Sequence, residues 1–176
     1  KSWDSFAKRL KPFKERWSSD SIAIGPEHRG IRFSVMNQDG RAFIKMSGEV
    51  TDATIVYTTN STDPTASDSI FKNPIPLRNN TEIRAQWMRN DSLLYPNPII
   101  QNFTYHLGVE AQVVWEQGPS AKYPAEGLNS IANGIKGDLT LGKSWMGAEG
   151  TDMSFVLEWK EPRYMSTVDL KYFHAP

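Results

Sequence analysis

The feature that most constrains the fold of this chain is a change in its hydrophobic period after Arg29. From residue 31 onward, short stretches alternate apolar and polar side chains, and clusters of Gly, Pro, Asn, Asp and Ser separate these stretches. Successive side chains of a strand point to opposite faces of a sheet, so the alternation predicts strands that bury one face. We therefore expect a mainly β fold over most of the 176 residues.

The first alternating stretches predict a β-hairpin. Residues 31–36 and 42–46 alternate on either side of Asp39-Gly40, a dipeptide that favours a two-residue hairpin turn. Further strands are predicted at TIVYTT, TEIRAQWM and NFTYHL, and turn residues separate them. Short strands at this spacing are typical of an immunoglobulin-like or fibronectin-like antiparallel β-sandwich, which we place at residues 30–107.

Two of these strands also predict which side chains form the core. In TEIRAQWM, alternation places one set of side chains inward and the intervening set outward. The inward set is Ile83, Ala85 and Trp87, and the outward set is Glu82, Arg84 and Gln86. In NFTYHL, residues 102–107, the inward set is Phe103, Tyr105 and Leu107.

The ends of the chain carry different patterns. In residues 1–29, large apolar side chains recur at three- and four-residue steps, which predicts an amphipathic helix that Pro12 interrupts. After a boundary at Gly108, residues 108–176 contain strand-like VEAQVVW, SFVLEW and STVDLKYF around a Gly-rich and Asn-rich middle. We expect a second β-domain there.

Composition excludes several classes of function. The 20 basic and 20 acidic residues balance, so no net charge attracts nucleic acid or an anionic membrane. Without cysteine, the chain has no disulfide, thiolate metal site or cysteine nucleophile. No apolar run reaches the roughly 18–20 residues that a membrane-spanning helix needs.

We predict no catalytic residue, no cofactor and no metal site. Residues 137–144, GDLTLGKS, satisfy the phosphate-loop pattern, but no buried strand precedes them and two glycines oppose a helix after them. The three histidines have no metal-ligand spacing, and no Gly-x-Ser-x-Gly elbow is present. Acidic residues are scattered, whereas sugar hydrolysis normally uses two positioned carboxyl groups.

Aromatic residues in the second half provide the best binding signal, because Trp and Tyr rings stack on sugars while polar neighbours bond the hydroxyl groups. Trp145 lies in a Gly-rich stretch near Glu149 and Asp152, and we predict that it is an exposed platform with Tyr123. Core packing is the competing interpretation. It applies best to Trp159, which is in register with the apolar residues of SFVLEW.

Three segments resemble the C-terminal region of β-N-acetylhexosaminidases of glycoside hydrolase family 20, of the type found in Bacteroidetes. The opening WDSFAKRLKPFKERW is similar to the last helix of the catalytic barrel. The stretch IVYTTNSTDPTASDSIFKNPIPLRNNTEIRAQW resembles the chitobiase/hexosaminidase C-terminal domain. The residues that match its motif in order are Tyr57, Thr58, Asp63, Pro64, Pro76, Ile83 and Ala85.

The third segment, from YPAEG to KYF, resembles the first half of a discoidin-like jelly roll. Its matching residues are Tyr123, Pro124, Gly127, Asn133, Gly134, Gly137, Trp145, Gly147 and Val168. The resemblance therefore divides the chain into a barrel helix and linker at 1–29, an immunoglobulin-like domain at 30–107 and a partial jelly roll at 108–176.

The resemblance implies a non-catalytic accessory region that packs on an upstream catalytic barrel of the same polypeptide. The family's catalytic Asp-Glu pair lies in that barrel, so no hydrolysis by this chain is implied. It also implies a periplasmic, outer-membrane-associated or extracellular bacterial protein. The alternatives are a carbohydrate-binding module for N-acetylhexosamine-containing glycan and an adhesion module. A half jelly roll leaves unpaired strand edges, so we also expect a homodimer through the tail.

Overall fold

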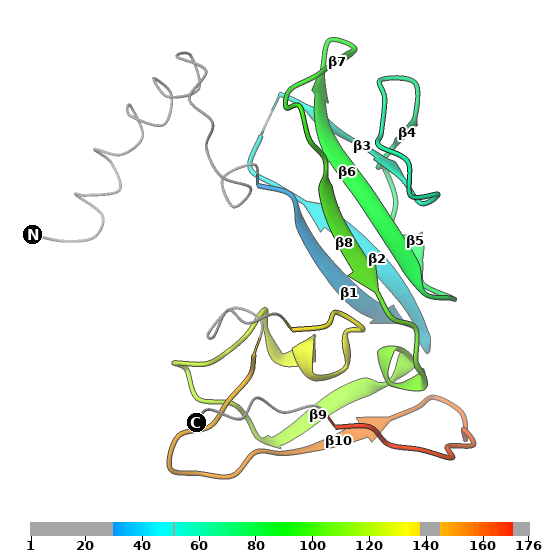
Figure 1. Cartoon of the computed structure of the whole chain (residues 1–176). Coiled ribbons are helices and arrows are strands. Elements are labelled where there is room, and N and C mark those ends of the chain that lie inside the picture. Colours follow the sequence, from blue (N-terminus) through cyan, green and yellow to red (C-terminus); the bar gives the residue numbers. More distant parts are fainter. Residues whose placement is uncertain (1–29, 51, 138–144, 171–176) are drawn as a thin grey trace, which may run out of the picture.

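A computed structural model of the chain describes residues 30–50, 52–137 and 145–170 (Figure 1). These residues form a mainly β structure with antiparallel sheets, as predicted. The predicted helix at residues 1–29 and most of the phosphate-loop pattern lie outside the described residues.

The predicted hairpin is formed by β1 (Arg32–Gln38) and β2 (Arg41–Ser47). The strands are antiparallel and Gln38 pairs with Arg41, so the loop contains only Asp39 and Gly40. Both loop residues have positive φ, 53° and 72°, as a type I′ turn requires. Glycine adopts this conformation without a steric penalty, which explains why Asp-Gly was an informative signal.

Two antiparallel sheets contain all the described strands before residue 104. In the first, β2 lies between β1 and β5 (Ile75–Pro76). In the second, β6 (Thr81–Arg89) is central and pairs with three strands. Its partners are β3 (Thr54–Thr58), β7 (Ser92–Leu93) and β8 (Ile99–Phe103), and β4 (Ser69–Ile70) pairs with β3.

The two sheets share one hydrophobic core. Phe33 of β1 meets Phe103 of β8 edge to face, with ring centroids 6.0 Å apart. Ile44 of β2 and Ile83 of β6 have no exposed surface. Burying an aliphatic side chain of this size contributes about 1.5–3 kcal/mol relative to exposure. The core therefore holds both sheets together, although the finer immunoglobulin-like assignment stays a prediction.

The outward face of β6 differs from the prediction at Gln86. Ile83, Ala85 and Trp87 are buried as expected, but Gln86 is buried as well, at 3% exposure. Its side-chain Nε2 donates a hydrogen bond to the carbonyl oxygen of Tyr95. A contact with the segment that follows β7, which alternation cannot report, therefore satisfies the buried amide.

The predicted strand at residues 102–107 is misplaced. The strand, β8, ends at Phe103, and a short 3-10 helix, η2 (Leu107–Glu110), follows. The backbone N–H of Thr104 donates to the carbonyl of Gly134, 2.8 Å away, and that of Tyr105 donates to Asn80 Oδ1 at 2.9 Å. These partners outside the sheet end the strand.

The second half contains a two-stranded antiparallel sheet, β9 (Gln112–Gln117) and β10 (Ser154–Glu158), with the 3-10 helix η3 (Leu128–Ala132). The rings of Trp115 and Phe155 lie 5.1 Å apart between their centroids. The predicted strand STVDLKYF does not form over its described residues 166–170. Val168 and Leu170 are 84% and 68% exposed, so no neighbouring strand among the described residues pairs with this segment. The jelly-roll assignment stays a prediction.

Several contacts join the two halves end to end (Figure 1). Val109 of η2 is buried and belongs to the core that the first two sheets share. The indole Nε1 of Trp159 donates to the carbonyl of Leu107 at 2.9 Å, and the Asn37 side chain donates to the carbonyl of Glu110. The predicted boundary at Gly108 therefore falls within a packed junction.

Candidate functional site

The structure brings together part of the predicted carbohydrate site. The backbone N–H of Gly147 donates a hydrogen bond to the carbonyl oxygen of Tyr123, 3.1 Å away. The adjacent residues Pro124 and Met146 form an isolated antiparallel bridge. Pairing of these two loops therefore places Tyr123 close to the segment that carries Trp145 and Glu149.

A lysine that the sequence reasoning did not single out links this cluster. Lys122 Nζ lies 3.2 Å from Glu149 Oε2 and 5.1 Å from the centroid of the Tyr123 ring. The Tyr123 hydroxyl and then the Glu149 carboxylate raise the pKa of Lys122 above its usual range. The sequence could have indicated Lys122 only by its position next to Tyr123, and a surface lysine is too common to be distinctive.

The other two predicted residues fit the site less well. Trp145 is partly buried and already has an interaction partner, and its role as an aromatic platform stays a prediction. Asp152 is exposed, and no polar contact within the described residues joins it to Tyr123 or Glu149.

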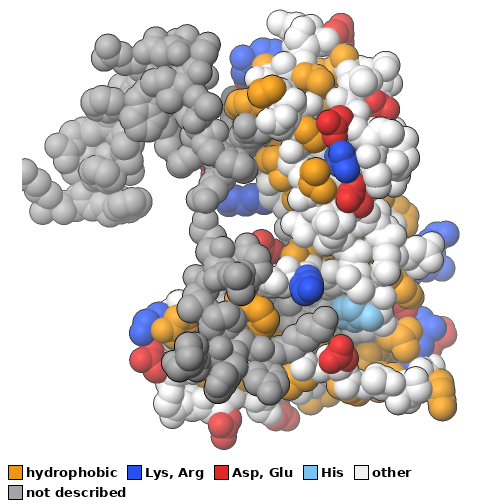
Figure 2. All heavy atoms as spheres, in the orientation of Figure 1, with side chains coloured by type: hydrophobic (Ala, Val, Ile, Leu, Met, Phe, Trp, Pro, Cys, Tyr) orange, Lys and Arg blue, Asp and Glu red, His pale blue; other side chains and the backbone are white. Residues whose placement is uncertain are grey.

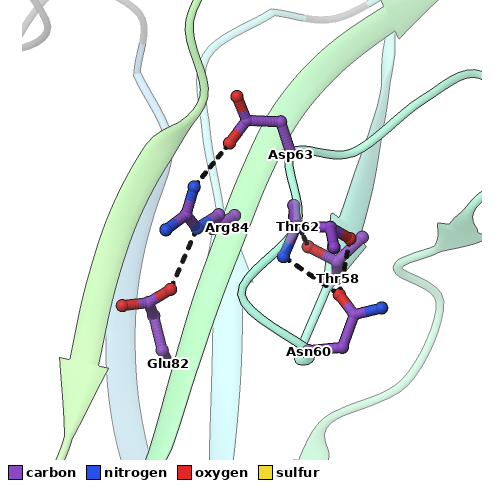
Figure 3. Close-up of polar contacts among 6 residues, drawn as sticks. All are labelled: Thr58, Asn60, Thr62, Asp63, Glu82 and Arg84. Atoms are coloured by element: carbon purple, nitrogen blue, oxygen red, sulfur yellow. Dashed lines mark hydrogen bonds and ion pairs between the residues drawn. The ribbon is translucent and has the colours of Figure 1, made fainter.

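A second polar cluster is formed by residues of β6 and of the loop after β3, within the segment that resembles the family motif (Figure 3). The guanidinium of Arg84 bridges two carboxylates, with Nη1 2.7 Å from Asp63 and Nε 2.9 Å from Glu82. The hydrogen bond from Arg84 lowers the pKa of Glu82. The hydrogen bonds to Asp63 and, to a smaller extent, to Glu82 raise the pKa of Arg84.

The loop after β3 holds Asp63 in position. Thr58 Oγ1 donates to the carbonyl of Thr62, and both the backbone N–H and the hydroxyl of Thr62 donate to Asn60 Oδ1, at 3.2 and 2.6 Å (Figure 3). Pro64 is buried directly after Asp63. The motif residues thus fix a turn against the sheet.

This ion cluster does not have the properties of a hydrolytic acid–base pair. A general acid needs a raised carboxyl pKa near neutral pH, whereas Glu82 is held in its ionised form by Arg84. Within the described ranges, no group of three or more His, Asp or Glu side chains is arranged to hold a metal ion. The cluster is therefore best explained as a contact that stabilises the loop.

The junction between the two halves contains a polar hollow that sequence reasoning missed. Its volume is about 520 Å³, and it lies between the β1–β2 turn and the segment after β10. Its lining residues are Gln38, Asp39, Gly40, Arg41, Phe43, Glu110, Trp159, Lys160, Glu161 and Arg163. These residues come from three distant parts of the chain, so no local motif could reveal them.

On the face shown in Figure 2, Lys and Arg side chains are interspersed with Asp and Glu. The distribution on this face agrees with the balanced composition. Among the described residues, no helix is both long and apolar enough to cross a membrane.

Comparison with protein families gives a match within the first half of the chain. No curated protein matches the chain. Residues 31–99 match the family model of the chitobiase/beta-hexosaminidase C-terminal domain. The match covers β1 to β7 and reaches the first residue of β8, and it includes Asp63, Glu82 and Arg84. That domain is a non-catalytic domain of hexosaminidases, and the match supports this family for the sheet-forming segment of the chain.

Proposed function

We propose that this chain is a non-catalytic accessory region of a β-N-acetylhexosaminidase of glycoside hydrolase family 20, and that it supports the catalytic domain of that enzyme. The family match over residues 31–99 carries the proposal. The geometry agrees, because the motif residues anchor a turn and build a core, and Arg84 lowers the pKa of Glu82 instead of raising it as a general acid needs. The proposal places the chain outside the bacterial cytoplasm, as in the enzymes that it resembles.

The direct test is an assay of the chain alone with an aryl N-acetyl-β-glucosaminide. We expect no release of the aryl group above the rate without protein. Release that scales with protein concentration would contradict the proposal. Asp63→Asn and Glu82→Gln variants would then show whether these carboxylates cause it.

The coding sequence upstream of Lys1 provides an independent test. The proposal expects a barrel domain there that carries an adjacent Asp-Glu pair. An upstream region without such a domain would remove the catalytic partner that the accessory role needs.

A second candidate function is carbohydrate binding at the cluster around Gly147. The observation that favours it is the grouping of Tyr123, Lys122 and Glu149, which combines an aromatic ring with a charged donor and an acceptor. Titration with chitooligosaccharides, followed by Trp fluorescence, tests this function. A saturable response that Glu149→Gln and Trp145→Ala both weaken would support it, and a flat response would leave only the supporting role.

We also propose that the chain self-associates through its second half. Val114 and Val156 pair across β9 and β10 and are 37% and 44% exposed, and Val168 and Leu170 are more exposed still. Exposed apolar strands are prone to pair with another chain. Sedimentation velocity should show a dimer whose fraction rises with concentration. A monomer at all accessible concentrations would contradict this proposal.

A further inference from the structure

The hollow at the junction has an aromatic wall that the fold holds in place. Trp159 is partly buried, and its Nε1 donates to the carbonyl of Leu107. Phe43 of β2 is also partly buried and lines the same space. Aromatic rings in a concave site commonly contact the apolar faces of a ligand, and a ring with a fixed indole loses little freedom on binding.

The charges around the hollow cancel. The lining includes the cations Arg41, Lys160 and Arg163 and the anions Asp39, Glu110 and Glu161. A concave site with no net charge attracts neither an anion nor a cation selectively. It does offer both donors and acceptors of hydrogen bonds, which a ligand rich in hydroxyl groups needs.

Part of this polar lining is fixed by contacts within the protein. Arg163 Nη2 lies 3.2 Å from Glu110 Oε2, and the Tyr105 hydroxyl donates to Glu110 Oε1 at 2.8 Å. Lys160 Nζ lies 3.7 Å from Asp39 Oδ1. The contacts of Glu110 hold one end of the lining in place before any ligand arrives, whereas the exposed Lys160–Asp39 pair contributes little.

The remaining polar lining is available to a ligand. Within the described part of the chain, the side chains of Gln38, Arg41 and Glu161 have no hydrogen-bond or ion-pair partner, and all three residues are exposed. They supply an amide, a guanidinium and a carboxylate beside the aromatic wall. The volume of about 520 Å³ lies within the range of about 300–1,000 Å³ that is usual for small-ligand pockets.

From this geometry we propose that the hollow between the β1–β2 turn and the segment after β10 is a binding site for a neutral saccharide of one or two rings. Trp159 and Phe43 contact the apolar faces of the sugar, and Gln38, Arg41 and Glu161 bond its hydroxyl or amide groups. The site is separate from the cluster around Gly147 and includes none of the motif residues at 55–87, although its lining from Gln38 to Phe43 lies within the family match. It therefore goes beyond the supporting role proposed above.

The test is a titration of the whole chain, labelled with ¹⁵N, with N,N′-diacetylchitobiose and with cellobiose. The chain has six tryptophans, so the indole N–H signals are few, and the signal lost in Trp159→Phe assigns Trp159. We expect a saturable shift of the Trp159 signal with at least one sugar. Arg41→Gln and Glu161→Gln should each weaken this binding about tenfold, as loss of a hydrogen bond to a charged group does.

Arg78→Gln is the matched control, because Arg78 is exposed, does not line the hollow and also lacks a partner among the described residues. It should leave the affinity unchanged. Three results would overturn the proposal: no saturable shift of the Trp159 signal with either sugar, equal affinities in all three variants, or binding that Glu149→Gln abolishes while Arg41→Gln leaves it intact. The last result would assign binding to the cluster around Gly147.

Discussion

Two glycines of this chain have opposite surroundings. A Cβ added at Gly48 would lie 2.3 Å from the carbonyl oxygen of Gly30 and 2.3 Å from the Trp87 ring. A Cβ added at Gly118 would meet nothing within 4 Å. The absence of a side chain at Gly48 therefore lets the chain that follows β2 approach a buried tryptophan, whereas Gly118 has no such role.

This difference predicts opposite effects of the same substitution. Gly48→Ala should lower the free energy of unfolding by about 1–3 kcal/mol, because neither the backbone carbonyl nor the buried indole can move away without disturbing the core. Gly118→Ala should leave it unchanged or raise it by up to about 1 kcal/mol, because it restricts only the unfolded chain. Urea denaturation measures both. Equal effects would show that Gly48 is not tightly packed.

Arg84 predicts how stability depends on pH. Because the Arg84 bond lowers the pKa of Glu82 in the folded protein, the ionised carboxylate contributes stability above its unfolded pKa. That contribution is lost as the pH falls through the lower, folded pKa. The free energy of unfolding should therefore fall in the acid range, and Arg84→Met should make this fall smaller.

The comparison isolates Arg84 because other titrating groups are common to both proteins. The Thr65 hydroxyl lowers the pKa of Asp68, so the free energy of unfolding also falls as Asp68 protonates. Burial lowers the pKa of His106, so the free energy of unfolding falls as His106 protonates, at a higher pH than for the carboxylates. Both remain in Arg84→Met and cancel in the difference. Parallel pH profiles of the two proteins would show that Arg84 does not stabilise the Glu82 carboxylate.

Residue-scale prediction from sequence worked where a local rule was sufficient. The Asp39-Gly40 turn follows from the backbone preferences of two adjacent residues, and the structure confirms it. The outward placement of Gln86 was wrong, because its burial depends on a contact with Tyr95 that local periodicity does not report. Lys122 links Tyr123 to Glu149, and this contact forms only when the two loops pair in the folded protein.

Among the elements, β6 is the strand with most partners. It pairs with β3, β7 and β8, and its Ile83 side chain is completely buried between the two sheets. Ile100 of β8 lies in the same sheet but is 48% exposed. Substitution of each isoleucine therefore distinguishes the contribution of core packing to stability from that of strand propensity.

Ile83→Ala should lower the free energy of unfolding by about 2–5 kcal/mol, since it removes buried methyl groups and leaves a cavity. Ile100→Ala should have a much smaller effect, within about 1 kcal/mol, because water already reaches that side chain. Denaturant unfolding followed by circular dichroism compares them. Similar losses from both variants would contradict the placement of the shared core.

The elements that sequence predicted correctly have strong alternation and clear turns on both sides. β1, β2, β3 and β6 all lie within one or two residues of their predicted positions. The strand predicted at residues 102–107 was displaced because Thr104 and Tyr105 bond to Gly134 and Asn80 instead of a neighbouring strand. Residues 166–170 alternate well but have no partner strand within the described structure, and alternation alone does not form a sheet.

For the whole molecule, the junction couples the two halves. Trp159→Phe keeps an aromatic ring but removes the donor to Leu107 and should destabilise the protein by about 1 kcal/mol. Hydrogen exchange should then rise on both sides of the junction, at Thr104 and at Val109.

Trp115→Phe is the matched control for the junction. It removes the bond from Trp115 Nε1 to the carbonyl of Leu128, at 3.1 Å, which lies entirely within the second half. Its effect on exchange should stay in β9 and η3. If Trp159→Phe also raised exchange only in the second half, the two halves would not be coupled through this contact.

The proposed accessory role is tested most directly in the β-N-acetylhexosaminidase that the proposal expects to contain this chain, with the two isoleucine variants already described. The account predicts that Ile83→Ala shortens the half-life of β-N-acetylhexosaminidase activity at elevated temperature, that Ile100→Ala does not, and that neither changes the initial kcat/KM. Equal half-lives for both variants and the wild type, or an immediate loss of kcat/KM in Ile83→Ala with the enzyme still folded, would contradict it.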